Sequence, residues 1–455
     1  MNKVMNLIIK KYLKDKNLKE LIQGGSISFI FRIGGLIMGY ILTLLIAKLF
    51  GAEGLGEYVL AVTVLRLFVL IAKLGFDTTS IRFLASFVIQ KKWDSIHFFR
   101  RKVIFILIIT SIISSICMYL FSEDLGLLLS LDYKYIRLNS FFVLPMVFFM
   151  LHYQSLRGLK RIGDFSFFYR MSQSLFSIIA IVVLYQFIAD DAIPIYAYLI
   201  SLLIVSALSF VSFQYHYERK KRGEISAELK ILNYSTLFKI SIPLMFAQSV
   251  QFIMAWTDKL MLGVMATSQE VGIYHTAFKL SMFAAIALMS VNSITSPKIA
   301  ELYAKNDLNQ VKNVAQSSTK IIFWLTLPLL VLFFTFPTFF LGLFGSEFKL
   351  GVTAFLILSV GRLVSSFSGS VGNILQMTNN QNYFAGVLFL GAIINIVLNL
   401  VLIPSSSPLA QYGYSGINGA AIASMMSLIF WNLSMVLIVK KKLGFYTFYF
   451  PFIRK

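Results

Sequence analysis

The sequence has little of what holds a soluble domain together or marks an enzyme. Only one cysteine, Cys117, occurs among 455 residues, which excludes an intramolecular disulfide. Charged residues make up 13% of the chain, whereas about a quarter is usual in soluble domains. The zinc-protease, nucleophile-elbow, P-loop and paired-cysteine signatures are missing from it. These absences argue against a soluble enzyme and against a secreted domain held by disulfides.

Long apolar runs dominate the sequence instead. Hydrophobic residues make up 58% of it, and the mean hydropathy is +0.78. A run of about 20 apolar residues is the length at which a helix crosses a bilayer. The pattern therefore predicts an all-α integral membrane protein with about twelve transmembrane helices. The expected spans are 25–49, 55–75, 102–121, 137–157, 166–189, 194–215, 237–262, 268–293, 320–343, 350–373, 383–403 and 417–439.

The charges between these spans predict the side of the membrane on which each loop lies. Cytoplasmic loops carry an excess of Lys and Arg, and basic clusters alternate here with short neutral or acidic loops. Both termini are therefore expected in the cytoplasm, and Lys134 and Arg137 are the main exceptions. The net charge of +21 then reflects topology and does not indicate a nucleic-acid partner. The basic clusters occupy 82–102, 157–161, 219–222, 298–312 and 440–442.

The same patterns divide the chain into five segments. Residues 1–24 are basic and amphipathic, and no cleavage site of small residues follows a short apolar core. They are therefore expected to form an interfacial cytoplasmic helix and not a removable signal peptide. A six-helix bundle is expected at 25–215, a cytoplasmic linker at 216–236, a second six-helix bundle at 237–440 and a basic cytoplasmic tail at 441–455.

An internal repeat relates the two expected bundles. The segment from Gly51 to Gly56, followed by Tyr58, corresponds to Gly263 to Gly272, followed by Tyr274. Many transporters are built from such repeats and bind their substrate between them. Both halves begin on the same side, so the repeats are expected to be parallel. The alternative is that two membrane hairpins look alike by composition.

Charges inside the spans point to a polar cavity, because each costs about 2.5–3.5 kcal/mol near the bilayer centre. In the first span, Ser28 and Arg32 share a face that continues through Gly35, Gly39 and Thr43. Close helix packing alone explains the two glycines, but it does not explain the arginine. A second stripe on the tenth span predicts water or a polar ligand beside Arg362. Its members are Ser359, Arg362, Ser366, Gly369, Asn373 and Gln376.

Taken together, the intramembrane charges predict a cationic cavity. Few acids are available to balance the basic residues, and guanidinium groups bind phosphate in a bidentate manner. An anionic substrate is therefore expected, although Arg170 could equally anchor its helix at the interface. Gln248 belongs to the polar lining with Ser28, Ser359, Ser366 and Asn373. Asp258 and Lys259 form either a local ion pair or a site for a coupling ion. The expected cationic set is Arg32, Arg362, Arg66, Lys73, Arg170 and Lys279.

Several short segments resemble one known superfamily. They are Leu49–Tyr58, Gly158–Arg161, Asp258–Tyr274, Pro297–Asp307 and Leu402–Ala423. Through them the chain resembles the multidrug/oligosaccharidyl-lipid/polysaccharide exporter superfamily, and specifically its bacterial polysaccharide flippases. The resemblance covers nearly the whole chain, although each motif is short and mostly structural.

The resemblance implies a fold and a function. The implied fold has two six-helix bundles around a V-shaped central cavity. The implied function is to flip an undecaprenyl-diphosphate-linked oligosaccharide across the bacterial inner membrane by alternating access, for surface polysaccharide such as O-antigen, lipopolysaccharide or capsule. No cofactor is implied, and coupling to H⁺ or Na⁺ is left open. The implied partners are the lipid-linked oligosaccharide, membrane lipids and other polysaccharide-assembly proteins, and the protein is expected to be a monomer.

Two other functions remain as alternatives. A cation-coupled multidrug or small-molecule exporter has the same topology, but such exporters typically keep acidic residues in the membrane. Mutation of Asp258 and of the arginines would distinguish the exporter from the flippase. A membrane-embedded polymerase or ligase fits least, because the loops expected outside are too short to hold a catalytic domain.

Overall fold

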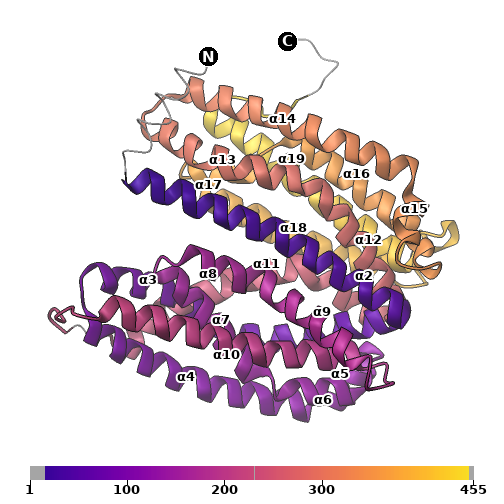
Figure 1. Cartoon of the computed structure of the whole chain (residues 1–455). Coiled ribbons are helices and arrows are strands. Elements are labelled where there is room, and N and C mark those ends of the chain that lie inside the picture. Colours follow the sequence, from indigo (N-terminus) through magenta and orange to yellow (C-terminus); the bar gives the residue numbers. More distant parts are fainter. Residues whose placement is uncertain (1–15, 230, 450–455) are drawn as a thin grey trace. The chain divides into compact units, whose positions relative to one another are not determined.

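The computed structural model describes residues 16–229 and 231–449, and within them every regular element is a helix (Figure 1). Ten of these helices are long and apolar enough to cross a membrane. An eleventh span results if the bent pair Tyr133–Ser140 and Val143–Gly158, which meet at 53°, crosses as one. The predicted fold class, an all-α membrane protein, is therefore confirmed.

The helices follow one another along the chain with short connections. In order they are α2 (Lys16–Ala72), α3 (Phe76–Ile89), α4 (Trp93–Leu120), α5 (Ser122–Leu129), α6 (Tyr133–Ser140), α7 (Val143–Gly158), α8 (Ile162–Phe167), η1 (Phe168–Ser172), α9 (Gln173–Leu184), α10 (Ile193–Lys221), α11 (Tyr234–Met265), α12 (Ser268–Ser281), η2 (Met282–Ala284), α13 (Ala285–Ala304), α14 (Leu308–Thr335), α15 (Pro337–Gly342), η3 (Glu347–Gly351), α16 (Val352–Ser368), α17 (Val371–Met377), α18 (Gln381–Leu402), η4 (Ala410–Tyr412) and α19 (Gly416–Leu443).

Helix α2 contains the first two expected spans, which meet at a kink. Gly51 has φ 68° and ψ −170°, a conformation open to glycine because it lacks a Cβ. The helix starts again at Ala52, whose backbone N–H donates to Oε1 of Glu347 at 2.7 Å. A carboxylate is well suited to this place, since the first N–H groups of a helix have no partner within it.

The tenth expected span is also broken, and here the expectation of one continuous helix is wrong. Helix α16 ends at Ser368, and Gly369 has φ 73° before α17 begins. A Cβ on Gly369 would lie 2.0 Å from Oγ1 of Thr319, so no larger side chain fits. The polar stripe from Ser359 to Gln376 is therefore divided between two helices.

The described chain forms two compact units. Within the described residues, unit 1 comprises 16–42, 65–122, 134–229 and 231–248, and unit 2 comprises 43–64, 123–133 and 249–449. In unit 1, α7 packs against α3, α4 and α10, and α10 packs against α9. In unit 2, α19 packs against α16 and α18, and α13 packs against α14.

The segment boundaries expected from the sequence stay predictions. The expected interfacial helix at 1–24 lies largely outside the described residues, which begin as helix at Lys16. The end of the expected basic tail, residues 450–455, also lies outside them.

Candidate functional site

A cavity of about 400 Å³ lies within unit 2. Helices α11, α12, α16, α18 and α19 and the turn η2 contribute its walls. Most of the lining is apolar and aromatic, and Phe278, Met282 and Trp431 are examples. The polar part of the lining is small. It consists of Gln251, Arg362, Asn395, Ser424 and Ser427.

Arg362 is the one charged side chain that lines this cavity. Its Nη2 lies 2.8 Å from Sδ of Met282, and its Cζ lies 5.7 Å from the centre of the Phe278 ring. Within residues 16–229 and 231–449, no carboxylate forms a salt bridge with it. A thioether is a weak acceptor, so most of the guanidinium donors stay available to an anion.

Asp258 on α11 is the centre of a buried hydrogen-bond network. Its side chain is nearly inaccessible, with 7% of the residue exposed. Oδ1 accepts from Nδ2 of Asn395 at 2.9 Å and from Nδ2 of Asn399 at 2.8 Å. Oδ2 accepts from the hydroxyl of Tyr274 at 2.6 Å and from the hydroxyl of Ser424. Four donors around one carboxylate compensate for its removal from water.

The lysine beside Asp258 has its own contacts. Nζ of Lys259 donates to the carbonyl of Ala255 at 2.9 Å and lies 4.5 Å from the Trp256 ring centre and 4.6 Å from that of Phe278. These are cation–π distances. The carboxylate of Asp258 accepts hydrogen bonds from four neutral donors. An ion pair between Asp258 and Lys259 therefore stays a hypothesis. Lys279, another expected cation, donates to the hydroxyl of Thr43.

Unit 1 holds a separate pair of arginines. Arg170 lies on the π-helical turn η1, and its carbonyl packs on Gly35 of α2, where a Cβ would come within 2.5 Å of the oxygen. Arg32, on the same part of α2, interacts electrostatically with Arg170. In the described part of the chain neither guanidinium forms a salt bridge with an acid. Gly35 therefore serves close packing, as the sequence indicated.

Lys73 and Gln248 belong to a different arrangement from the one expected. Nζ of Lys73 lies 2.8 Å from Oδ2 of Asp77 and also donates to the amide oxygen of Gln248. The amide nitrogen of Gln248 donates to Thr78 at 2.8 Å and to Asp77 at 3.2 Å. The charge of Lys73 is thus balanced within the protein. Arg66, another expected cation, is half-buried and acts electrostatically on Tyr153.

None of the residues expected as polar lining is among those that line the cavity of unit 2. Ser359 and Ser366 are buried, and their hydroxyls donate to carbonyls of their own helix at 2.7 Å. Asn373 donates to Ser296 on α13, and Ser28 is half-buried in unit 1. A serine hydroxyl can donate a hydrogen bond to a backbone carbonyl in the preceding turn of its own helix. This explains why a helix face with several serines can pack against protein.

Sequence reasoning missed the partners of Asp258. Asn395 and Asn399 stand one turn apart on a span, which indicated a joining role but not the carboxylate as their target. Tyr274 and Ser424 gave no signal, because both residue types are common in membrane helices. A buried acid near a helical pair of asparagines is the pattern that would have indicated the network.

Comparison with known proteins gives the family. A family model described as polysaccharide biosynthesis protein matches residues 21–303, and the chain belongs to this family. The MatE family model matches residues 243–401. The class defined by fold and family is thus a multi-pass membrane protein of polysaccharide biosynthesis.

Two curated relatives come from Haloferax volcanii. One, described as the probable low-salt glycan biosynthesis flippase Agl15, is 26% identical over 45% of this chain and 42% of its own length. The other, the probable flippase AglR, is 24% identical over 66% of this chain and 59% of its own length. The chain therefore spans about half the length of the curated relatives it matches. Both are described as flippases and not as enzymes.

Solved structures show the same fold at low identity. The lipid II flippase MurJ, in an inward closed conformation, has a TM-score of 0.70 and 16% identity, over 92% of this chain and 87% of that one. An inward-facing multidrug resistance MATE family transporter of the MOP superfamily has a TM-score of 0.67 and 14% identity, over 91% and 98%. These structures show the fold, and the family-model matches and curated relatives confirm the superfamily expected from the sequence.

Proposed function

We propose that the protein flips a lipid-linked oligosaccharide across the membrane that it spans. The fold shared with a lipid flippase and the flippase descriptions of two relatives support this proposal. The resemblance implies that a diphosphate joins lipid and sugar in this substrate, and such a group would stay ionised at neutral pH. An anion of this kind needs cationic donors wherever it leaves the water.

The observation that carries the proposal is the environment of Arg362. Its guanidinium lines a largely apolar cavity and, among the described residues, has no carboxylate partner. A charge kept unbalanced in such a place is costly unless a ligand balances it. We assign it to the diphosphate, with Arg32 and Arg170 of unit 1 as further cations on the substrate's route.

We propose the finer points of the function from the family resemblance and the loop charges. The lipid would be undecaprenyl diphosphate and the membrane a bacterial inner membrane, with both termini in the cytoplasm. The flipped repeat unit would supply a surface polysaccharide such as O-antigen or capsule. Transport would proceed by alternating access, and the proteins that make and polymerise the repeat unit would be its functional partners.

A reconstitution experiment tests the proposal. The purified protein is placed in vesicles with a fluorescent polyprenyl-diphosphate disaccharide, and a membrane-impermeant quencher reports how much label has reached the outer leaflet. Faster equilibration than in protein-free vesicles is expected, together with weaker stimulation for a matched polyprenyl disaccharide joined by a neutral ether. Equal rates for both compounds would contradict the role of the diphosphate.

Asp258 offers a site for a coupling ion, which the second candidate function, cation-coupled export, requires. Oδ1 of Asn399, next to the carboxylate, is buried without a hydrogen-bond partner in the described residues. A carboxylate with neighbouring amide and hydroxyl oxygens is a ligand set suited to a hard cation, and the carboxylate alone can carry a proton. We propose that H⁺ or Na⁺ binding at Asp258 drives the conformational cycle. This applies to a flippase and to a small-molecule exporter alike.

A further inference from the structure

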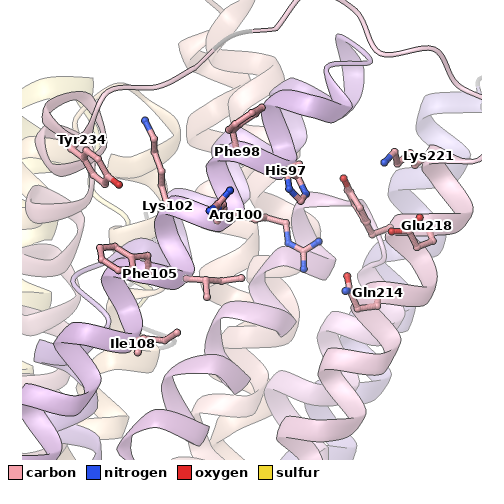
Figure 2. Close-up of a pocket in the computed structure, with 13 residues that line it drawn as sticks. His97, Phe98, Arg100, Lys102, Phe105, Ile108, Gln214, Glu218, Lys221 and Tyr234 are labelled. Carbon is pink, nitrogen blue, oxygen red and sulfur yellow. The ribbon is translucent and has the colours of Figure 1, made fainter.

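A pocket in unit 1 is lined by none of the residues assigned above to transport. Its volume is about 870 Å³, and it is lined by the first half of α4, the last two turns of α10 and the first residue of α11 (Figure 2). Four of its side chains are permanently cationic: Arg100, Arg101, Lys102 and Lys221. Glu218 is the one acid that lines it. The pocket therefore carries an excess of positive charge.

Two of the cations are held by contacts with neutral groups, and Arg100 also interacts electrostatically with Glu218. Arg100 stacks on aromatic rings of α10, with Cζ 4.6 Å from the centre of Phe213 and 5.1 Å from that of Tyr217. Nζ of Lys102 donates to the carbonyl of Leu232 at 2.8 Å and lies 4.8 Å from the Tyr234 ring. Within residues 16–229 and 231–449, none of the four cations forms a salt bridge.

The pocket changes character along α4. Figure 2 shows Lys102 and Lys221 on opposite sides of the space, with Phe105 and Ile108 further along α4. Both of these apolar side chains are exposed, and the exposed apolar face continues through Ile112 and Ile116. Helix α4 is long and apolar enough to cross a membrane, so we assign this face to the lipid chains. The cations, near the end of the span, lie at the level of lipid headgroups.

We propose that this pocket binds the headgroup of an anionic membrane phospholipid, with the acyl chains lying along α4. Basic pockets between membrane helices bind such headgroups, and charge-assisted hydrogen bonds from Arg and Lys select phosphate. Continuity with the lipid-facing side of α4 is the reason to assign a lipid as the occupant and not a soluble anion. The proposal requires only that the protein spans a membrane, so it does not depend on the flippase proposal.

Native mass spectrometry of the purified full-length protein tests the inference. Dioleoyl phosphatidylglycerol is titrated against dioleoyl phosphatidylcholine, and the bound lipids are counted. The variant is Arg101→Gln with Lys221→Gln, because both side chains are exposed and can be replaced without disturbing packing. The matched control is Arg82→Gln with Arg222→Gln, which removes the same charge from exposed positions of unit 1 outside the pocket.

The wild type and the control are expected to bind one phosphatidylglycerol roughly tenfold more tightly than the pocket variant, since at least one charge-assisted hydrogen bond is lost. Arg100→Lys in the wild-type background keeps the charge and should keep the binding. Equal weakening in the variant and the control, or equal binding of phosphatidylcholine, would overturn the proposal. So would displacement of phosphatidylglycerol by equimolar polyprenyl diphosphate, because the pocket would then hold the transported substrate.

Discussion

Gly56 and Gly272 pack against each other reciprocally. A Cβ on Gly56 would lie 1.7 Å from the carbonyl oxygen of Ser268, and a Cβ on Gly272 would lie 2.0 Å from that of Ala52. The Cβ position of each glycine thus lies against the carbonyl of the residue four positions before the other glycine. The two glycines stand at matching places in the sequence repeat. Small residues let the backbones of α2 and α12 approach this closely.

Substitution of either glycine is expected to destabilise the fold. In Gly272→Ala the new methyl group meets a backbone oxygen, and moving the two helices apart should cost about 1–3 kcal/mol, as overpacking does. Gly386→Ala on α18 is the control, because nothing lies within 4 Å of its Cβ position. The melting temperature of the detergent-purified proteins is the measurement. An unchanged melting temperature for Gly272→Ala would show that the helices separate freely.

Arg362→Ala is expected to slow flipping about tenfold to a hundredfold, because charge-assisted hydrogen bonds of about 1.5–3 kcal/mol are lost. Arg362→Lys should recover part of the rate, since the charge survives but the bidentate geometry does not. The vesicle assay measures both rates, normalised to the amount of folded protein. A bracing role for Arg362 predicts a different result, in which folded protein is lost while the rate per folded molecule stays unchanged.

The double variant Arg32→Ala and Arg362→Ala is expected to flip more slowly than either single variant. If both arginines bind the same substrate at different stages, their effects combine. Arg82→Ala, at an exposed position of α3, serves as the control for loss of one positive charge. A double variant as active as the Arg362→Ala protein would remove Arg32 from the substrate's route.

Asp258→Asn is expected to uncouple transport from an ion gradient. The amide is close to the carboxylate in size, but it carries no charge and turns one acceptor into a donor facing other donors. The flipping rate of the wild type should rise when an H⁺ or Na⁺ gradient is imposed. The flipping rate of the variant should be the same with and without the gradient. Ser427→Ala, in the cavity wall but outside the Asp258 network, is the control. A variant that still responds to the gradient would exclude Asp258 as the coupling site.

Cysteine labelling tests the predicted topology in a Cys117→Ser background. Cysteines at Asp191 and Gln411 should react with a membrane-impermeant thiol reagent from outside the cell, and cysteines at Lys221 and Lys305 should not. All four positions are exposed in the structure, so a lack of reaction reports the side of the membrane. Labelling of position 221 from outside would reverse the orientation inferred from the loop charges.

The spans were predictable because hydropathy acts locally, and each expected span corresponds to helix in the structure. The kinks were not, because Gly51 and Gly369 resemble glycines that only allow close packing, such as Gly35. Whether a glycine breaks a helix depends on what its neighbours place beside it, and for these two the neighbours are Glu347 and Thr319.

The candidate site was predictable only in part. Arg362 was predicted because a charged side chain within a membrane span is energetically costly, and it does line a cavity. The Asp258 network joins α11 to residues 16, 137, 141 and 166 positions away, and a single sequence read alone cannot pair such distant groups. The pairing of Lys73 with Asp77, one turn apart on the chain, was within reach, since residues four apart share a helix face.

The contact between Ala52 and Glu347 constrains the order in which the protein can be completed. The two residues lie 295 positions apart, which the ribosome covers in about 15–60 s at about 5–20 residues per second. Throughout that time the second half of α2 is already synthesised, while the N–H at its start lacks its carboxylate. The hydrogen bond beside the kink at Gly51 can therefore form only after the final third of the chain has begun to emerge. Truncated or stalled chains should enter the membrane with this corner still unformed, which would expose it to the quality-control proteases that survey nascent membrane proteins.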